Sequence, residues 1–201
     1  MPMYFEASSE DVRCPQCGDL QATNDGGILV MQGPAAPTLE EEDYPPSVYA
    51  LLSKVEPEHF WFGERNRLIL STMREVLRSL EGRTVVDIGC GSGFVTAALE
   101  RAGMWTCGLE AHMAGLRLAR TRMHGQLLCE TAMRIPFAAQ FDAAMLCDVI
   151  EHAPDDIAVL RAAGAALRPG GIVVVTVPAH QWLWSPLDDA WVTSGGTRDR
   201  C

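Results

Sequence analysis

The sequence predicts an α/β protein built on a doubly wound, mostly parallel β-sheet with helices on both faces. From about Gly82 onward, short β-branched and apolar runs alternate with segments of helical periodicity. A run of glycines follows the first of these strands and leads directly into a helix. Residues 171–177 are apolar on both faces, as in a buried parallel strand. Such alternation requires right-handed crossovers between parallel strands.

The chain divides into four predicted parts. Residues 1–46 form an acidic N-terminal segment that is loop-like up to Gly33 and continues as a Pro-rich linker. Residues 47–81 form a helical cap, residues 82–190 form the α/β core, and residues 191–201 form a disordered tail without apolar periodicity. Our hypothesis for this tail is a one-base frameshift near Ala190. Possible codons for residues 190–198, read with one base deleted, permit Leu-Gly-His-Val-Arg-Arg-Tyr-Ala-Arg, which resembles the continuation of a known family.

Each element has its own pattern. In the cap, a short helix is expected over residues 49–58, and a longer helix over residues 65–80 places Ile69, Met73, Val76, Leu77 and Leu80 on one face. The inner face of the last core helix is expected to carry Ile157, Leu160, Gly164 and Leu167. The core strands are expected at 84–88, 104–109, 127–129, 141–147 and 171–177, and the core helices at 94–102, 116–123 and 155–167.

Composition and charge exclude several classes of protein. The 201 residues are 48% hydrophobic and 21% charged, which is ordinary for a folded protein. Residues 1–60 hold eleven acids against Arg13 and Lys54, so they carry −9 of the net charge of −10. No basic surface for nucleic acid is expected, and a small-molecule partner is favoured by elimination.

The chain start and the cysteines indicate the compartment. No run approaches the roughly 18–20 apolar residues of a membrane helix, and the N-terminus lacks the features of a secretory signal. The seven cysteines are odd in number and fit reduced thiols in a cytoplasmic protein.

The pair Cys14 and Cys17 has the spacing of half a zinc ribbon. Tetrahedral zinc needs a second pair after about twelve to twenty residues, and the next cysteine is Cys90. A degenerate knuckle without metal is therefore favoured over a zinc site, unless His59 or a second subunit completes it.

The glycine loop is the most informative stretch. Residues 84–94 read Thr-Val-Val-Asp-Ile-Gly-Cys-Gly-Ser-Gly-Phe, and the G-x-G-x-G spacing with Phe94 departs from the dinucleotide fingerprint. Asp87 would repel a pyrophosphate and attract an ammonium or sulfonium group. Glu110 follows about twenty residues later, where an acid accepts hydrogen bonds from ribose hydroxyls. Ribose with a cationic amino-acid tail describes S-adenosylmethionine, and a nucleotide-cofactor oxidoreductase is the less favoured alternative.

This loop resembles the first motif of the class I S-adenosylmethionine-dependent methyltransferases, in particular their type 11/12-like domains. The resemblance covers about residues 82–178 and implies a Rossmann-like core with S-adenosylmethionine as cofactor. Thr131 stands where the family usually has an Asp that contacts the adenine amino group. Four further segments agree, namely Glu110, Ile135-Pro136-Phe137, Phe141-Asp142 through His152, and Leu167-Arg168-Pro169-Gly170-Gly171. The cofactor-binding residues that the resemblance implies are Asp87, Gly89, Cys90, Gly91, Gly93, Glu110, Ala111, Thr131, Ala132 and Asp148.

The resemblance also implies the chemistry, which is in-line displacement at the sulfonium methyl group by an acceptor. His152 is the candidate catalytic base, and the alternative is that its imidazole packs the adjacent helix start or the cofactor rim. Cys90 is interpreted as a small residue that fits the loop, since methyl transfer needs no protein nucleophile. His59 and the aromatic residues 60–62 either form a substrate lid or pack the cap onto the sheet edge.

The family's sheet continues past the fifth core strand, whereas this sequence is expected to lack those late strands. The strand at 171–177 is then an exposed, apolar edge and an aggregation hazard. A catalytically inactive or truncated cofactor-binding relative is therefore an alternative to an active methyltransferase.

Overall fold

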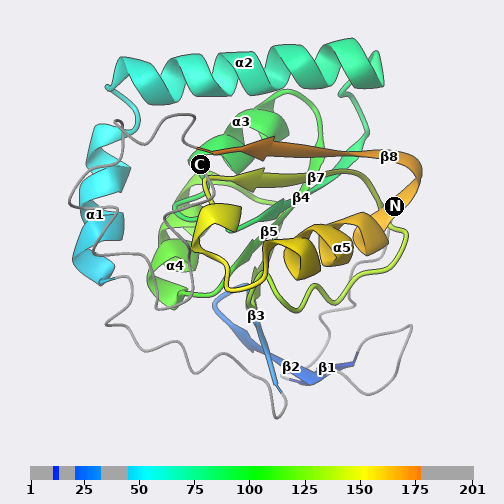
Figure 1. Cartoon of the computed structure of the whole chain (residues 1–201). Coiled ribbons are helices and arrows are strands. Elements are labelled where there is room, and N and C mark those ends of the chain that lie inside the picture. The colour runs from blue at the N-terminus through cyan, green and yellow to red at the C-terminus, as the bar shows by residue number, and fades with distance from the viewer. Residues whose placement is uncertain (1–10, 14–20, 33–44, 178–201) are drawn as a thin grey trace.

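The computed structural model describes residues 11–13, 21–32 and 45–177, and these form an α/β structure around one sheet (Figure 1). The eight described strands lie in the order β1-β2-β3-β6-β5-β4-β7-β8. The strands are β1 (Asp11–Arg13), β2 (Gln21–Asp25), β3 (Ile28–Met31), β4 (Thr84–Ile88), β5 (Trp105–Glu110), β6 (Gln126–Cys129), β7 (Phe141–Cys147) and β8 (Leu167–Thr176). The helices are α1 (Pro46–Val55), α2 (Phe60–Leu77), α3 (Phe94–Arg101), α4 (Met113–Arg122) and α5 (Asp156–Ala166), with a 3-10 turn η1 (Ile150–His152).

The sheet is mostly parallel. All pairs from β3 to β8 are parallel, and only the β1–β2 and β2–β3 pairs are antiparallel. The carboxyl ends of β4 to β8 therefore meet at one edge, on the side of the molecule where α1 stands (Figure 1). This confirms the predicted doubly wound fold and every predicted core strand and helix.

The N-terminal segment differs from the loop that the sequence predicts. Residues 21–31 form a hairpin, β2–β3, that turns at Gly26 (φ 60°) and Gly27 (φ 87°) and adds to the sheet beside β6. Leu29 and Met31 are each 1% exposed and belong to the main core. The loop prediction is wrong here because the partner strand that buries β3 lies about one hundred residues further along the chain and leaves no local signal.

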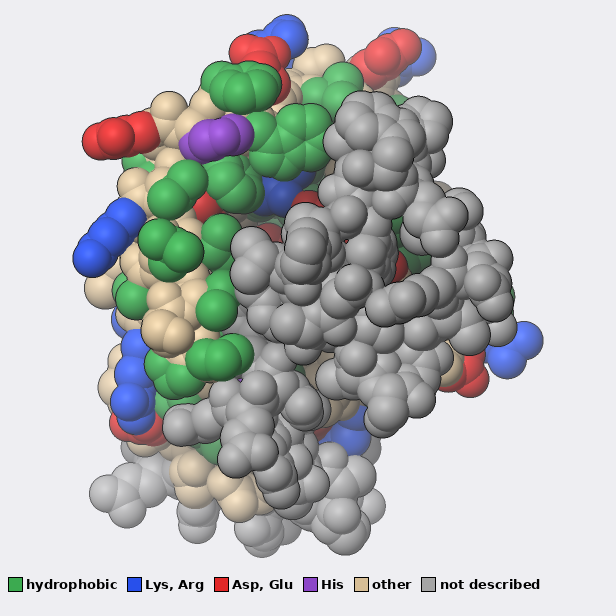
Figure 2. Space-filling view, turned by 60° about the vertical axis from the view of Figure 1, so that its left-hand side comes forward, with side chains coloured by type: hydrophobic (Ala, Val, Ile, Leu, Met, Phe, Trp, Pro, Cys, Tyr) green, Lys and Arg blue, Asp and Glu red, His purple; other side chains and the backbone are tan. Residues whose placement is uncertain are grey.

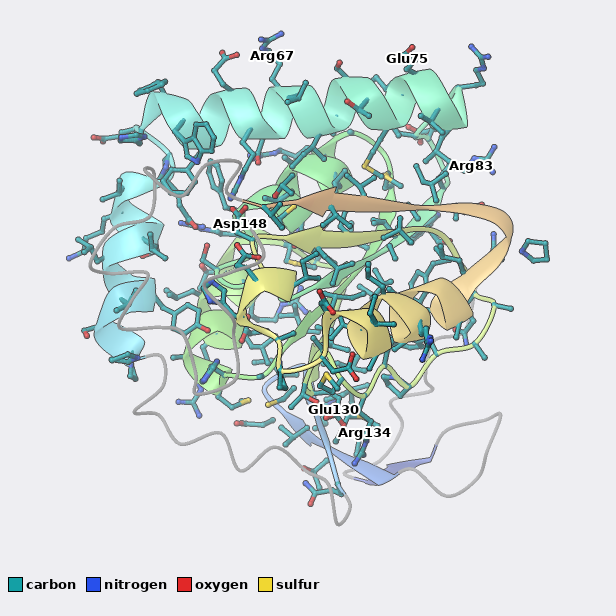
Figure 3. The ribbon with its side chains drawn as sticks, in the orientation of Figure 1. Arg67, Glu75, Arg83, Glu130, Arg134 and Asp148 are labelled. Carbon is teal, nitrogen blue, oxygen red and sulfur yellow. The ribbon has the colours of Figure 1, made fainter. Side chains whose placement is uncertain are left out.

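The two cap helices cover different parts of the core. α2 lies along one face with Ile69 and Met73 buried, but Val76 is 54% exposed, contrary to its predicted place on the inner face. The opposite side of α2 faces solvent, where Arg67 and Glu75 point away from the sheet (Figure 3). His59 caps this helix by accepting a hydrogen bond from the Trp61 amide at 3.3 Å.

Hydrophobic side chains gather on the surface of the cap (Figure 2). Two exposed residues lie on α1 and two at the start of α2, and we call these four the cap patch: Leu51, Val55, Phe60 and Trp61. Phe62 instead turns inward and meets the Phe94 ring edge-on, with a centroid distance of 6.3 Å. The aromatic run at 60–62 thus splits between packing and exposure.

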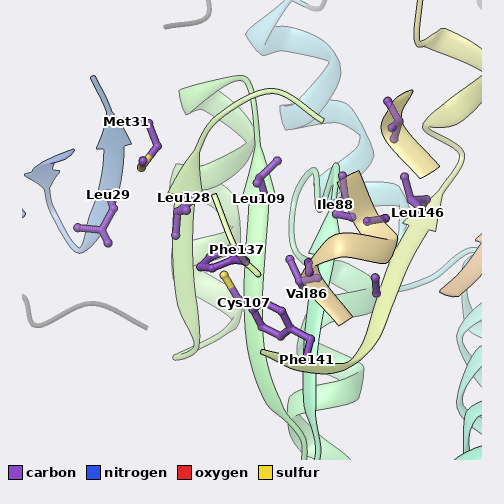
Figure 4. Close-up of a cluster of buried hydrophobic side chains, with 14 of the residues drawn as sticks. Leu29, Met31, Val86, Ile88, Cys107, Leu109, Leu128, Phe137, Phe141 and Leu146 are labelled. Carbon is purple, nitrogen blue, oxygen red and sulfur yellow. The ribbon is translucent and has the colours of Figure 1, made fainter. Parts of the chain in front are cut away.

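The core lies on both faces of the sheet. Side chains of α2 and α3 pack on β4 and β7, and α4 packs on β3 and β6 on the same face. α5 covers the opposite face. Figure 4 shows part of this second layer, in which Phe137 meets Phe141 edge-on at 5.0 Å.

The inner face of α5 also differs from the prediction. Val159, Ala163 and Ala166 are fully buried, whereas Ile157 is 50% exposed. Leu160 and Leu167 are partly buried and pack against the core as predicted, so the prediction is wrong for Ile157 and misses the fully buried residues. Because almost every position of this Ala-rich helix is small or apolar, periodicity alone selects the buried face only in part.

β8 is the strand at the other end of the described sheet. Within the described residues it pairs only with β7, and its Val173 and Val175 are 38% and 37% exposed. This agrees with the predicted exposed apolar edge.

Several predictions concern residues outside the described ranges. Cys14, Cys17, the linker over 34–44 and the tail from residue 178 lie there, so the half zinc site and the frameshift stay predictions. Among the described residues, no group of three or more His, Cys, Asp or Glu side chains could hold a metal ion. No helix in the same ranges is long and apolar enough to cross a membrane.

Candidate cofactor site

The glycine loop joins β4 to α3 at the carboxyl edge of the sheet. The amides of Gly89 and Cys90 donate to the Leu109 carbonyl at 2.7 and 3.0 Å, which ties the loop to β5. Gly91 has φ 54°, and no described atom lies within 4 Å of the place where a Cβ would stand. The loop therefore presents bare backbone to open space, as close approach of a ligand requires.

Gly93 has the opposite role, because it allows two helices to approach. A Cβ on this residue would lie 2.8 Å from the Ala119 Cβ and 3.0 Å from its Cα. Gly93 also has φ 73°, in the left-handed region that disfavours other residues. The third glycine of the loop thus fixes the packing of α3 against α4.

Asp87 lies beneath the loop, 1% exposed. The Thr96 hydroxyl donates to its Oδ2 at 2.5 Å. Burial raises the pKa of Asp87 to about 6, and the Thr96 hydrogen bond and the charge of Arg65 offset only part of that rise. A cation beside this carboxyl would favour its ionised form.

Glu110 ends β5 and contacts the loop directly. Its Oε2 accepts a hydrogen bond from the Gly91 amide at 3.0 Å. Its Oε1 accepts from the His112 amide at 3.0 Å and from the Tyr49 hydroxyl at 3.2 Å. The structure therefore brings together the predicted loop and the predicted ribose-binding acid.

Asp148 follows β7 at the same edge (Figure 3). It has φ 56°, and its carboxylate accepts from the Thr176 hydroxyl at 3.1 Å and from Arg65 Nη1 at 2.5 Å. The Arg65 guanidinium lies over the Phe62 ring, and its Nε is buried with no hydrogen-bond partner among the described residues. This arrangement holds a buried cation beside Asp148 and close enough to Asp87 to lower its pKa.

The end of β6 carries the candidate adenine contacts. Thr131 and Ala132 follow the strand, and both are half-buried, as is Ala111 after β5. Glu130 is fully buried and pairs with Arg134 Nε at 2.9 Å (Figure 3). Burial raises the pKa of Glu130, and Arg134 and the Thr131 amide offset only part of that rise. Since Glu130 is already paired, Thr131 stays the candidate at this position.

His152 and Cys90 are the two candidates for reactive groups. His152 lies half-buried in η1, which follows β7 at the same edge. Cys90 is buried, and burial together with the charges of Asp87 and Glu110 raises the pKa of its thiol well above the usual value. A protonated thiol is a poor nucleophile, which fits the interpretation of Cys90 as a space-filling residue.

A second cluster joins α1 to the back of the loop. Glu56 follows α1 and is 7% exposed, and the Ser92 hydroxyl donates to its carboxylate at 2.7 Å. Arg122 forms an ion pair with Glu56 and donates to the Ser53 carbonyl at 2.7 Å. We call Glu56, Ser92 and Arg122 the α1 latch.

The sequence reasoning missed Tyr49, His112 and the latch as parts of this site. Tyr49 and the latch act through contacts between segments far apart in the chain, which spacing within one segment does not reveal. His112 lies only two residues from Glu110, but its contact with Tyr49 is again distant in sequence. Arg65 is different, because its position in a charged run upstream of the loop could have marked it as a candidate.

Comparisons with known proteins agree with this geometry. Residues 86–175 match the methyltransferase domain family. A ubiquinone biosynthesis O-methyltransferase from Bordetella avium is 32% identical over 120 residues, which are 54% of this chain and 48% of that protein. The chain thus spans about half the length of the curated relatives that it matches.

Two solved structures support the fold. The PH0226 protein from Pyrococcus horikoshii superposes with a TM-score of 0.59 at 19% identity, covering 73% of this chain and 68% of that one. CalS10, an amino pentose methyltransferase from Micromonospora echinaspora, gives a TM-score of 0.55 at 24% identity over 70% of this chain and 58% of its own. The fold is the Rossmann-like fold of these structures. Residues 86–175 are similar to the methyltransferase domain family, and this similarity supports S-adenosylmethionine as the cofactor.

Proposed function

We propose that this protein transfers a methyl group from S-adenosylmethionine to a small-molecule acceptor by in-line displacement. The observation that carries the proposal is the direct hydrogen bond from the Gly91 amide to Glu110, beside open space over the loop. It joins a backbone surface that a ligand can approach to a carboxylate that can accept ribose hydroxyls.

The residues present fit the cofactor. Asp87 would favour the ammonium group. The Nε of Arg65, which has no hydrogen-bond partner among the described residues, supports binding of the methionine carboxylate nearby. Glu110 would accept from the ribose, with Ala111, Thr131 and Ala132 near the adenine. Gly89, Cys90 and Gly93 shape the loop, and Asp148 would position Arg65.

When bound, S-adenosylmethionine supplies a methyl group already activated on a sulfonium. The protein then has chiefly to align this donor with the acceptor and to exclude water. Alignment of two bound reactants can contribute about 7–11 kcal/mol to lowering the barrier.

We assign His152 as the group that takes the acceptor's proton. The support is its place on η1 directly after β7, at the edge where the cofactor would bind. If this is correct, His152→Ala lowers kcat about 100-fold and removes the acid limb of the kcat–pH profile, with unchanged cofactor affinity. A parallel loss of cofactor affinity would show that His152 instead packs the cofactor rim.

The acceptor's chemical class is inferred from two observations. Relatives named as O-methyltransferases favour oxygen as the methylated atom. The cap patch exposes four apolar side chains on the two cap helices, which favours an acceptor with an apolar portion. The described free cysteines, Cys90, Cys107, Cys129 and Cys147, fit a reducing compartment and support a cytoplasmic location.

Calorimetry and turnover together test the proposal. We expect S-adenosylmethionine to bind and NADH not to bind, and Glu110→Gln to weaken S-adenosylmethionine binding at least tenfold. A screen of phenolic metabolites for S-adenosylhomocysteine release tests transfer. Tight cofactor binding without turnover on any acceptor would favour a non-catalytic relative, and NADH binding would favour the oxidoreductase alternative.

A further inference from the structure

Tyr49 is held firmly against the candidate ribose site. Its side chain comes from α1 and is 5% exposed. The hydroxyl lies 3.2 Å from Glu110 Oε1 and 3.2 Å from His112 Nδ1. The ring packs so closely on α4 that a Cβ at Gly115 would lie 2.7 Å from Tyr49 Cε1.

The Glu110 carboxylate already accepts several hydrogen bonds from the protein. Oε2 takes the Gly91 amide, while Oε1 takes the His112 amide and the Tyr49 hydroxyl and lies 3.1 Å from His112 Nδ1. An ionised carboxylate has about four lone-pair positions in total. The two amides are fixed by the backbone, so the Tyr49 hydroxyl is the donor that a movement of α1 would remove.

The α1 latch holds the other end of the same helix. Glu56 bonds to Ser92 of the glycine loop and pairs with Arg122 of α4. Arg122 also donates to the Ser53 carbonyl within α1. Both ends of α1 are thus attached to the elements that frame the site.

From these contacts we propose that α1 closes the site in the free protein, with the Tyr49 hydroxyl bound to Glu110 where a ribose hydroxyl of the cofactor binds. The inference rests on the proposed role of Glu110. Cofactor binding then requires Tyr49 to leave Glu110, and its apparent affinity is reduced by the small fraction of molecules in which α1 is open.

Tyr49→Phe tests this directly, because it keeps the ring packed on Gly115 and removes the competing hydroxyl. We expect S-adenosylhomocysteine to bind this variant about five- to tenfold more tightly than the wild type, as measured by calorimetry. Ser53→Ala is the matched control on α1, because among the described residues the Ser53 hydroxyl bonds only to the Ala50 carbonyl within the helix. The affinity of this variant for S-adenosylhomocysteine should not change. Weaker binding by Tyr49→Phe would overturn the inference and make Tyr49 a cofactor ligand.

Stopped-flow fluorescence gives a second, kinetic readout. In the wild type, the observed rate of S-adenosylhomocysteine binding should reach a plateau set by the opening of α1, and Tyr49→Phe should raise that plateau. A rate that stays linear in ligand concentration would contradict a closed α1.

Glu110→Gln separates the inference from the proposed function. If Glu110→Gln leaves wild-type affinity unchanged, the ribose assignment fails. If it weakens binding while Tyr49→Phe also weakens binding, the ribose assignment stands and the closure of α1 is wrong. Binding of S-adenosylhomocysteine by neither the wild type nor Tyr49→Phe contradicts both.

Discussion

At the scale of single residues, the raised pKa of Asp87 makes the free energy of unfolding depend on pH. Burial raises its pKa from 3.8 to about 6, so the folded protein binds this proton more tightly than the unfolded chain. The free energy of unfolding therefore falls by about 3 kcal/mol as the pH rises from about 4 to about 6, because Asp87 must ionise while buried. Above that range this contribution stays constant.

Asp87→Asn tests this consequence. We expect the variant to lack that decline between pH 4 and 6 and to be more stable than the wild type at pH 7, in urea unfolding without ligand. Thr96→Val is the companion variant, because removal of its hydrogen bond raises the pKa of Asp87 further and extends the decline to higher pH. Identical pH slopes for the wild type and Asp87→Asn would contradict the assignment.

Gly93 and Gly164 make a matched pair of glycines. Gly93→Ala should destabilise the protein by about 2–4 kcal/mol, because its φ is positive and its Cβ would push against Ala119. Gly164 lies in α5, and no described atom lies within 4 Å of the place where its Cβ would stand. Gly164→Ala should therefore stabilise the protein by about 0.5–1 kcal/mol. Thermal unfolding of both variants checks the two signs, and equal shifts would contradict the close packing at Gly93.

At the scale of elements, the β2–β3 hairpin is part of the core. Leu29→Ala should cost about 2–5 kcal/mol of unfolding free energy, because Leu29 is 1% exposed on β3. Leu51→Ala removes the same atoms from an α1 position that is 61% exposed and should change stability by less than about 0.5 kcal/mol. Equal costs in chemical denaturation would mean that the hairpin folds apart from the core.

The helices and strands differ in how well the sequence predicts them. The strands from β4 to β8 and the loop after β4 were predictable because each is marked within a few residues, by short apolar or β-branched runs or by Gly89, Gly91 and Gly93. The hairpin was missed although Asn24-Asp25-Gly26-Gly27 carries a turn signal, because its burial depends on β6. The buried face of α5 was predicted only in part, because its small residues leave little periodic contrast.

The residues of the site also divide into those with a local sequence signal and those that depend on distant contacts. Asp87, Glu110 and Asp148 were predictable from their positions at strand ends. Tyr49 was not, since its contact with Glu110 spans 61 positions of sequence and depends on the docking of α1. Tertiary contacts of this kind produce no local sequence motif, because the residues that make them lie far apart in the chain.

At the scale of the whole molecule, the sheet ends differently on its two sides. The β1–β3 strands cover β6, whereas β8 pairs only with β7 in the described ranges and exposes two valines. Exposed apolar strands at a sheet edge favour association between copies.

Val175→Lys should therefore reduce concentration-dependent self-association, measured by light scattering, with little change in unfolding temperature. Val55→Lys is a control of nearly equal exposure, 36% against 37%, on a helix instead of a strand. If both variants reduce association equally, general charge and not the β8 edge is responsible.

The register of β3 has a consequence for synthesis of the chain. Ile28 pairs with Leu127, so the hairpin has to wait for about one hundred further residues to leave the ribosome. At 5–20 residues per second this is a delay of about 5–20 s, during which Leu29 and Met31 have no sheet to join. The charge of −9 within residues 1–60 then acts on the nascent chain, where mutual repulsion keeps neighbouring unfinished copies apart.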